Sequence, residues 1–151
     1  MDKNIMILCT GYLFASDASF GYHVAKVLEK MQLPENVELM EVGESASEIP
    51  HILYDKDKLI VVDVFQTKDK PGTVVHLKQE EVPVTVDGIT DAGKFHLIDT
   101  LEQIKMTGKH LETTFIGVVP EDITSFGSQL NPEIEKKIPE VIELIMREIS
   151  Q

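Results

Sequence analysis

The sequence predicts a three-layer α/β fold, in which helices cover both faces of a mainly parallel sheet. Uncharged apolar runs at 5–8, 59–62 and 115–119 are typical of strands that are buried on both faces. Segments with apolar residues at helical spacing alternate with these runs, which favours a parallel sheet with crossover helices. The 151-residue chain is therefore expected to form one domain over residues 1–151.

The predicted strands and helices are read from apolar periodicity and from turn residues. Apolar residues at 20, 24, 27, 28 and 31 make one stripe on the first helix. The segment at 73–77 follows a polar Pro-Gly turn and is predicted as an antiparallel strand at an edge of the sheet. Strands are expected at 4–8, 37–41, 58–65, 73–77 and 113–119, and helices at 19–31, 47–53, 94–107 and from 131 onward.

Proline and glycine set the predicted helix boundaries. Pro50 lies in the first turn of the short helix, where proline is tolerated, and Gly108 ends the helix at 94–107 as a left-handed cap. Asn131 followed by Pro132 marks the start of the last helix. Pro139 should kink that helix or restart it. The stretch from 78 to 93 shows no strong period, and a loop of that length is usually functional or mobile.

The composition excludes several classes of function. The formal net charge is −12 and the only arginine is Arg147, so binding to nucleic acid or to a membrane surface is not expected. No apolar run reaches the ~20 residues of a membrane span, and the start of the chain lacks the pattern of a signal peptide. A single cysteine fits a reducing compartment. The expected location is the cytoplasm.

Two aspartates are the first candidates for a functional site. Asp63 interrupts a buried strand at its carboxyl end, and a buried carboxylate needs a metal, a cation or backbone donors. Asp17 follows the first strand. If these two strands are neighbours, both carboxylates reach one crevice at the carboxyl edge of the sheet. The alternatives are a structural cap for Asp63 and an N-cap of the first helix for Asp17.

Other residue types give weaker indications of chemistry. His96 lies near Asp91 and Asp99 and could add a nitrogen ligand for a transition metal, or it could be a partly exposed helix residue. Cys9 is interpreted as a small buried thiol rather than a nucleophile. The paired glutamates at 80–81 are interpreted as a solvated face. Neither a Gly-x-Ser-x-Gly nor a Gly-x-Gly-x-x-Gly motif is present, so residue types alone indicate no reaction.

Several segments together resemble a known family. They are the strand 5–8 with its loop, Asp17 and Gly21, and the segments 33–38, 59–63, 71–73, 80–83, 107–108 and 116–121. Over nearly its whole length the chain resembles the NiFe-hydrogenase maturation endopeptidases. The resemblance implies a peptidase that removes the C-terminal extension of the hydrogenase large subunit. It also implies that the bound nickel of the substrate guides cleavage, and that the partners are the large-subunit precursor or maturation factors.

The chain departs from this family at two of three metal-ligand positions. Asp63 is kept, but Ala18 stands where the family has an acidic ligand, and Gly93 stands where it has a histidine. Gly11 and Gly21 keep the outline of the site wall. The resemblance leaves two hypotheses. One is an endopeptidase whose site is rebuilt from Asp17, Asp63 and His96, with nickel supplied by the substrate. The other is a relative that binds a precursor or maturation factor without cleaving it.

A third hypothesis is that the fold serves an unrelated interaction, because fold does not imply function.

Two further expectations concern His96 and metal binding. Moving three residues along a helix shifts a side chain by ~4.5 Å along the axis. His96 lies three residues beyond the expected ligand position, so we predict that it and Asp63 do not share one metal ion. No tightly bound metal is expected.

Overall fold

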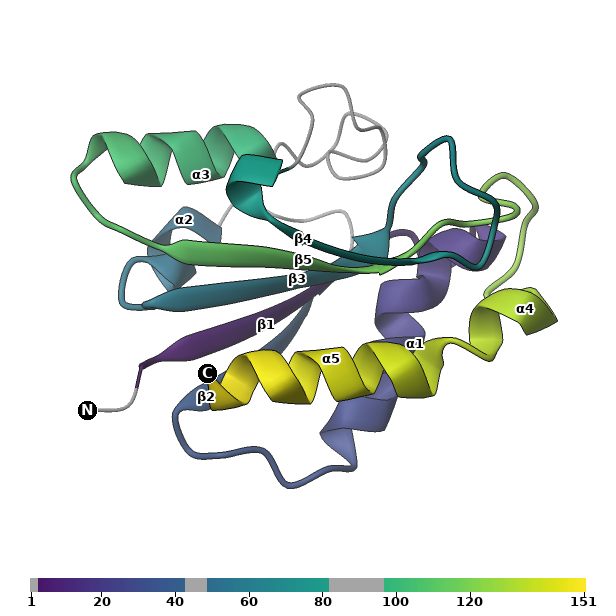
Figure 1. Cartoon of the computed structure of the whole chain (residues 1–151), viewed down its shortest axis with the longest axis horizontal. Coiled ribbons are helices and arrows are strands. Elements are labelled where there is room, and N and C mark those ends of the chain that lie inside the picture. Colours follow the sequence, from purple (N-terminus) through teal and green to yellow (C-terminus); the bar gives the residue numbers. More distant parts are fainter. Residues whose placement is uncertain (1–2, 43–48, 82–96) are drawn as a thin grey trace.

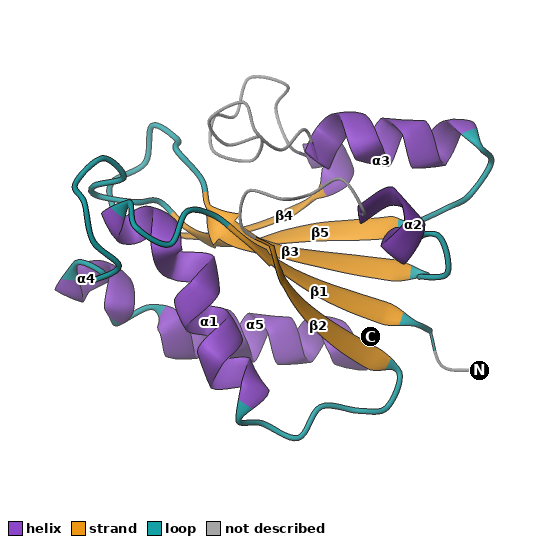
Figure 2. Cartoon of the chain, turned by 180° about the vertical axis from the view of Figure 1, so that it is seen from behind, coloured by secondary structure: helices purple, strands orange, loops and turns teal. Residues whose placement is uncertain are grey.

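The computed structural model describes residues 3–42, 49–81 and 97–151, and its centre is a five-stranded sheet with strand order β2-β1-β3-β5-β4 (Figure 1). Helices lie on both faces of this sheet, which confirms the predicted fold class (Figures 1 and 2). The strands are β1 (Ile5–Thr10), β2 (Val37–Val42), β3 (Lys58–Val64), β4 (Val74–Lys78) and β5 (Glu112–Val118). The α-helices are α1 (Phe20–Glu29), α2 (Ile49–Leu53), α3 (Leu97–Met106), α4 (Pro132–Glu135) and α5 (Ile138–Ser150), and short 3-10 helices are η1 (Ser16–Ser19) and η2 (Gln79–Glu81).

The pairing of the strands determines which strand ends lie at the same edge of the sheet. β1 lies between β2 and β3, and β3 pairs with β5, all in parallel register. β4 pairs with β5 antiparallel at the edge of the sheet, as the sequence predicted. β1 and β3 are therefore neighbours, and the loops after β1, β3 and β5 leave the sheet at the same edge.

Each face of the sheet carries its own hydrophobic core. α1 and α5 cover one face, and α2 and α3 cover the other (Figure 2). Alternate residues of the central strands point to opposite faces. In β3, for example, Ile60 and Val62 belong to the core under α1 and α5, whereas Leu59 and Val61 belong to the core under α2 and α3. This arrangement explains why the central strands have continuous apolar runs.

The C-terminal helix pair shows how proline sets the boundaries. α4 ends at Glu135, and α5 starts again at Ile138 with Pro139 in its first turn. The predicted restart at Pro139 is confirmed. Gly108 follows α3 with a positive φ of 89°, as expected for a helix C-cap. The first helix differs from the prediction, because a 3-10 turn precedes it and α1 ends two residues before Met31.

A buried ionic network joins α5 to the amino-terminal end of the sheet. The Lys58 side chain is fully buried, and its Nζ lies 2.8 Å from Glu148 Oε2 and 3.3 Å from Glu112 Oε2. Lys58 also donates to the backbone carbonyl of Glu148 at 2.8 Å. The second carboxylate oxygen of Glu148 lies 2.9 Å from Nε2 of His76 in β4. The network therefore links α5 with β3, β4 and β5.

This network makes stability depend on pH on the acid side. Burial alone would raise the pKa of Glu148, but hydrogen bonds from Lys58 and His76 outweigh it and hold the pKa below its ordinary value. A lowered folded-state pKa means that stabilisation is present above about pH 4.5 and is lost as the pH falls further. Denaturant unfolding between roughly pH 5 and pH 3 should show a flatter loss of stability for Glu148→Gln than for the wild type. The exposed Glu143 of the same helix supplies the control Glu143→Gln, which should leave the slope unchanged; equal slopes for all three proteins would contradict the assignment.

Candidate functional site

The carboxyl end of β3 carries a buried carboxylate. Asp63 is 2% exposed, and its Oδ2 accepts a 2.6 Å hydrogen bond from the hydroxyl of Thr10 at the end of β1. Its Oδ1 accepts from the backbone N–H of Val64 at 2.7 Å. The adjacent strand thus fixes the orientation of the Asp63 carboxylate. This position is the topological crevice in which ligands of open α/β sheets bind.

Two glycines allow the first loop to lie close to this carboxylate. Gly11 has a φ of +132°, and a Cβ there would stand 2.2 Å from the backbone oxygen of Ala18 and 3.2 Å from Asp63 Oδ1. A Cβ at Gly21 would stand 2.3 Å from the backbone oxygen of Thr10. Side chains at either position would therefore push η1 or α1 away from the ends of β1 and β3. Gly11 and Gly21 shape the wall beside Asp63.

Asp17 has a different environment from Asp63. It is fully buried, and its Oδ2 accepts from the N–H groups of Glu121 and Asp122 at 2.9 and 3.0 Å. Asn131 donates to the same carboxylate from its backbone N–H and from its side chain, both at 2.9 Å. The N-cap position of α1 is Ser19, so Asp17 does not serve as the N-cap. Asp17 instead joins the first loop to the loop between β5 and α4.

Ala18 offers no ligand atom from its side chain. Ala18 is buried at 7% exposure, and its backbone oxygen accepts from the N–H of Tyr12. Gly93 and His96 lie outside the described residues, so their predicted roles stay predictions. Within residues 3–42, 49–81 and 97–151, no three His, Cys, Asp or Glu side chains are arranged to hold a metal. The donors present in that part of the chain do not fit a resident metal ion.

The single cysteine is part of the core. Cys9 is fully buried in β1. Burial raises the pKa of its thiol well above the ordinary value, and the negative charge of Asp63 raises it further. A thiol that resists ionisation is a poor nucleophile. The interpretation of Cys9 as a small buried thiol agrees with this environment.

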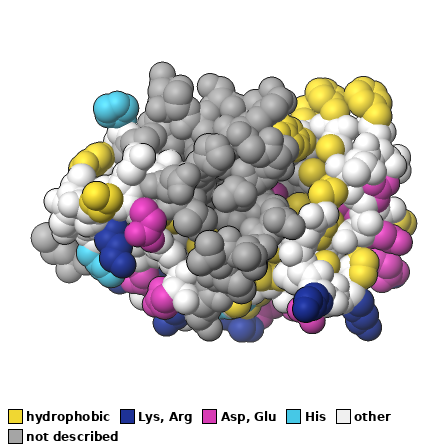
Figure 3. Space-filling view, turned by 90° about the horizontal axis from the view of Figure 1, so that it is seen from above, with side chains coloured by type: hydrophobic (Ala, Val, Ile, Leu, Met, Phe, Trp, Pro, Cys, Tyr) yellow, Lys and Arg dark blue, Asp and Glu magenta, His cyan; other side chains and the backbone are white. Residues whose placement is uncertain are grey.

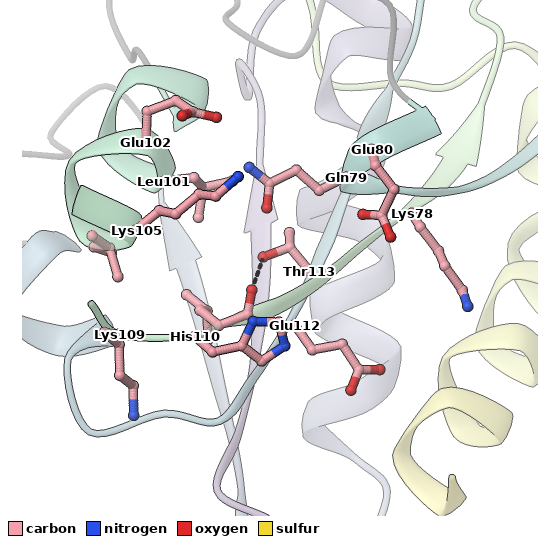
Figure 4. Close-up of a pocket in the computed structure, with 12 residues that line it drawn as sticks. Lys78, Gln79, Glu80, Leu101, Glu102, Lys105, Lys109, His110, Glu112 and Thr113 are labelled. Carbon is pink, nitrogen blue, oxygen red and sulfur yellow. Dashed lines mark hydrogen bonds between the residues drawn. The ribbon is translucent and has the colours of Figure 1, made fainter. Parts of the chain in front are cut away.

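A cavity of about 470 Å³ lies at the opposite end of the sheet (Figure 4). Lys105 of α3 and Gln79 of η2 extend into it, and His110 and Thr113 line its floor near the start of β5. Its lining mixes lysines with glutamates, among them Glu80. Glu112 lines the cavity, and Asp63 pairs with Gly117, five residues further along β5. Five residues of a strand span roughly 16 Å, so this cavity is separate from the Asp63 crevice.

Comparison with known proteins identifies the family of the chain. Residues 22–148 match the family model of hydrogenase maturation proteases. A putative hydrogenase maturation protease of Methanocaldococcus jannaschii is 33% identical over 99% of this chain and 98% of its own length. The chain belongs to the hydrogenase maturation protease family. This membership confirms the family that the sequence segments indicated.

Relatives from Escherichia coli support the same assignment. The hydrogenase 2 maturation protease is 28% identical over 94% of this chain and 88% of its own length. The solved structure of the hydrogenase maturating endopeptidase HybD from E. coli has a TM-score of 0.85 and 25% identity, and the match covers 99% of this chain and 93% of that chain. The family-model match begins at Tyr22 in the first turn of α1, so Ala18 lies before the matched residues. No helix in the described part of the chain is long and apolar enough to cross a membrane.

The sequence locates Asp63 and Asp17 but does not indicate the residues that hold them. Thr10 lies beyond the strand predicted at 4–8, whereas in the structure it ends β1 and donates to the Asp63 carboxylate. The signal for this role is the hydroxyl itself, because a hydroxyl at the end of a buried strand needs an acceptor. Asn131 was recognised only as the start of a helix, although it also holds Asp17.

Proposed function

We propose that this protein is a maturation endopeptidase that removes the C-terminal extension of a NiFe-hydrogenase large-subunit precursor. The observation that carries the proposal is the position of Asp63. In a chain of this family, it places an oriented, buried carboxylate at the carboxyl edge of the sheet, next to the wall formed by Gly11 and Gly21. The proposed compartment is the cytoplasm, in line with the single free thiol.

Nickel enters this proposal as part of the substrate. A metal ion next to a peptide bond can polarise its carbonyl or activate water. The contribution of this chain is to bind and orient the nickel-bearing precursor. Thr10 holds the Asp63 carboxylate in one orientation, and Asp17 holds the two flanking loops together. Because the precursor supplies the metal, the reaction does not need a resident ion in the protein.

Ala18 favours a second candidate function. A methyl group stands where the family has an acidic ligand, so metal-assisted cleavage would have one fewer carboxylate from the protein. A relative that binds the precursor or a maturation factor without cleaving it requires only the fold and the loop surface. Both functions are compatible with the precursor as partner, but only the endopeptidase releases a cleaved product.

Incubation of the purified protein with nickel-loaded and nickel-free precursor distinguishes these functions. The endopeptidase predicts that intact-mass spectrometry shows loss of the C-terminal extension from the nickel-loaded precursor only. Stable association without a change of mass would support the binding function and contradict cleavage. Absence of both association and cleavage would contradict the endopeptidase and also the binding of this precursor.

Restoring the family's ligand types should create a metal site. We expect Ala18→Glu combined with Gly93→His to give measurable zinc or nickel binding by calorimetry, because it adds a carboxylate and an imidazole to Asp63. The matched control is Ala18→Gln with Gly93→His, which has nearly the same size and lacks the negative charge. The control should bind at least about tenfold more weakly. Equal binding by both variants, or no binding by the Glu–His variant, would contradict the inferred geometry of the crevice.

A further inference from the structure

Two phenylalanines form an exposed stacked pair at the carboxyl edge of the sheet. Phe14 is 57% exposed and Phe126 is 90% exposed. Their ring centroids lie 5.9 Å apart and the ring planes differ by 15°. Phe14 belongs to the loop after β1, and Phe126 belongs to the loop between β5 and α4. We call these two rings the aromatic platform.

Backbone hydrogen bonds hold the two loops together directly beneath the aromatic platform. The N–H of Gly127 donates to the carbonyl of Phe14 at 2.9 Å, and the N–H of Ser16 donates to the carbonyl of Gly127 at 2.7 Å. Ala15 and Gly127 form an isolated parallel bridge. The relative position of the rings is therefore set by the main chain and not by contact between the rings alone.

Side chains fix the loop on the other side of Phe126. Oδ1 of Asp122 accepts from the N–H groups of Thr124 and Ser125 at 2.9 and 3.1 Å. The N–H of Asp17 donates to the carbonyl of Asp122 at 2.8 Å, while its carboxylate holds the N–H of Asp122. The loop thus presents a large apolar ring to solvent in a fixed geometry. Preorganised, exposed aromatic residues are typical centres of binding energy at interfaces.

The aromatic platform lies at the same edge of the sheet as Asp63, because its loops follow β1 and β5, which are parallel neighbours of β3. The loop that carries Phe14 starts at Gly11, where a Cβ would stand 3.2 Å from Asp63 Oδ1. In the view from above, hydrophobic side chains gather at the end of the molecule where the loops after β1, β3 and β5 lie in Figure 1 (Figure 3).

We propose that the aromatic platform of Phe14 and Phe126 binds an apolar side chain in the C-terminal region of the hydrogenase precursor. The inference rests on the proposed function and adds a specificity element to it. Two Phe rings bury roughly 300–500 Å² together at most, and a stable dimer needs about 800 Å² on each partner. The small area therefore fits a short peptide segment better than a second copy of this chain.

The charge beside the aromatic platform adds a second feature of that segment. Glu121 is exposed and Asp122 is half-buried, five and four residues before Phe126. The chain as a whole has a formal net charge of −12. A lysine or arginine next to the apolar side chain would complement this charge and speed the encounter. The expected segment therefore combines an apolar residue with a basic neighbour.

Binding of nickel-loaded precursor to single and double variants tests the proposal. Phe14→Ser and Phe126→Ser should each weaken the binding by about tenfold or more. Phe126→Tyr keeps an aromatic ring and should bind as the wild type does. The matched control is Met106→Ser, an 84% exposed apolar residue on α3, and it should not change the affinity. Thermal melting should be unchanged in all variants, because the substituted side chains are exposed.

The outcomes separate this inference from the function on which it rests. Wild-type affinity in the Phe14→Ser/Phe126→Ser variant would overturn the aromatic platform and leave the proposed function intact. Failure of the wild type to bind or process the precursor would overturn both. A wild-type dimer in sedimentation that the double variant dissociates would assign the aromatic platform to a second copy and overturn the peptide proposal.

Discussion

Asp17→Asn should lower the free energy of unfolding by about 3–5 kcal/mol. The Asp17 carboxylate accepts four hydrogen bonds, three of them from backbone N–H groups of Glu121, Asp122 and Asn131. In the amide one oxygen becomes an NH₂ group, which cannot accept from these donors. Buried N–H groups would then lack partners, and their desolvation cost is the reason for the large effect.

Chemical and thermal unfolding check the role of Asp17. For a chain of this size the loss corresponds to a decrease in the melting temperature of roughly 10 °C. The control is Asp69→Asn in the exposed turn between β3 and β4, which should change stability by less than about 0.5 kcal/mol. An effect of Asp17→Asn as small as that of the control would contradict the structural role assigned to this carboxylate.

Lys58→Met should lower the free energy of unfolding by about 3–5 kcal/mol as well. Lys58 is fully buried, and its ammonium group is the partner of the buried Glu148 and of Glu112. Methionine keeps much of the volume but leaves the Glu148 carboxylate without its main counter-charge. An uncompensated buried charge costs more than the ion pair contributes.

A double-mutant cycle separates loss of the pair from loss of packing. Lys58→Met combined with Glu148→Leu removes both charges, and it should be more stable than Lys58→Met alone by about 1–3 kcal/mol. Urea denaturation of the wild type, both single variants and the double variant gives the coupling energy. Additive effects would show that Lys58 and Glu148 act independently and would contradict the network.

The fold could be predicted from the sequence because its signals are local. The run at 59–62 is apolar on consecutive positions, which requires a strand covered on both faces, and β3 is covered in this way. The ring and the missing N–H of Pro139 are not compatible with a helix interior, so this single residue predicted the break between α4 and α5. The Pro-Gly turn before residue 73 is also a local signal, and it predicted the antiparallel edge strand that the structure shows as β4.

The environment of the candidate site could not be predicted in the same way. Asp17 lies 104 to 114 residues from the donors that surround it, and no periodicity relates such positions. Lys58 begins the predicted strand at 58–65, but its counter-charge lies 90 residues away on α5. Phe14 and Phe126 lie 112 residues apart in the sequence. Only the packing of the two loops brings these rings together.

The intact mass of nickel-loaded large-subunit precursor after incubation, with the wild type and with Asp63→Asn side by side, tests the central claim most directly. The proposed function predicts that the wild type releases the C-terminal extension and that Asp63→Asn, with an amide in place of the carboxylate beside Thr10, leaves the precursor at full mass. Release of the extension at the same rate by both proteins, or by neither, would contradict the account.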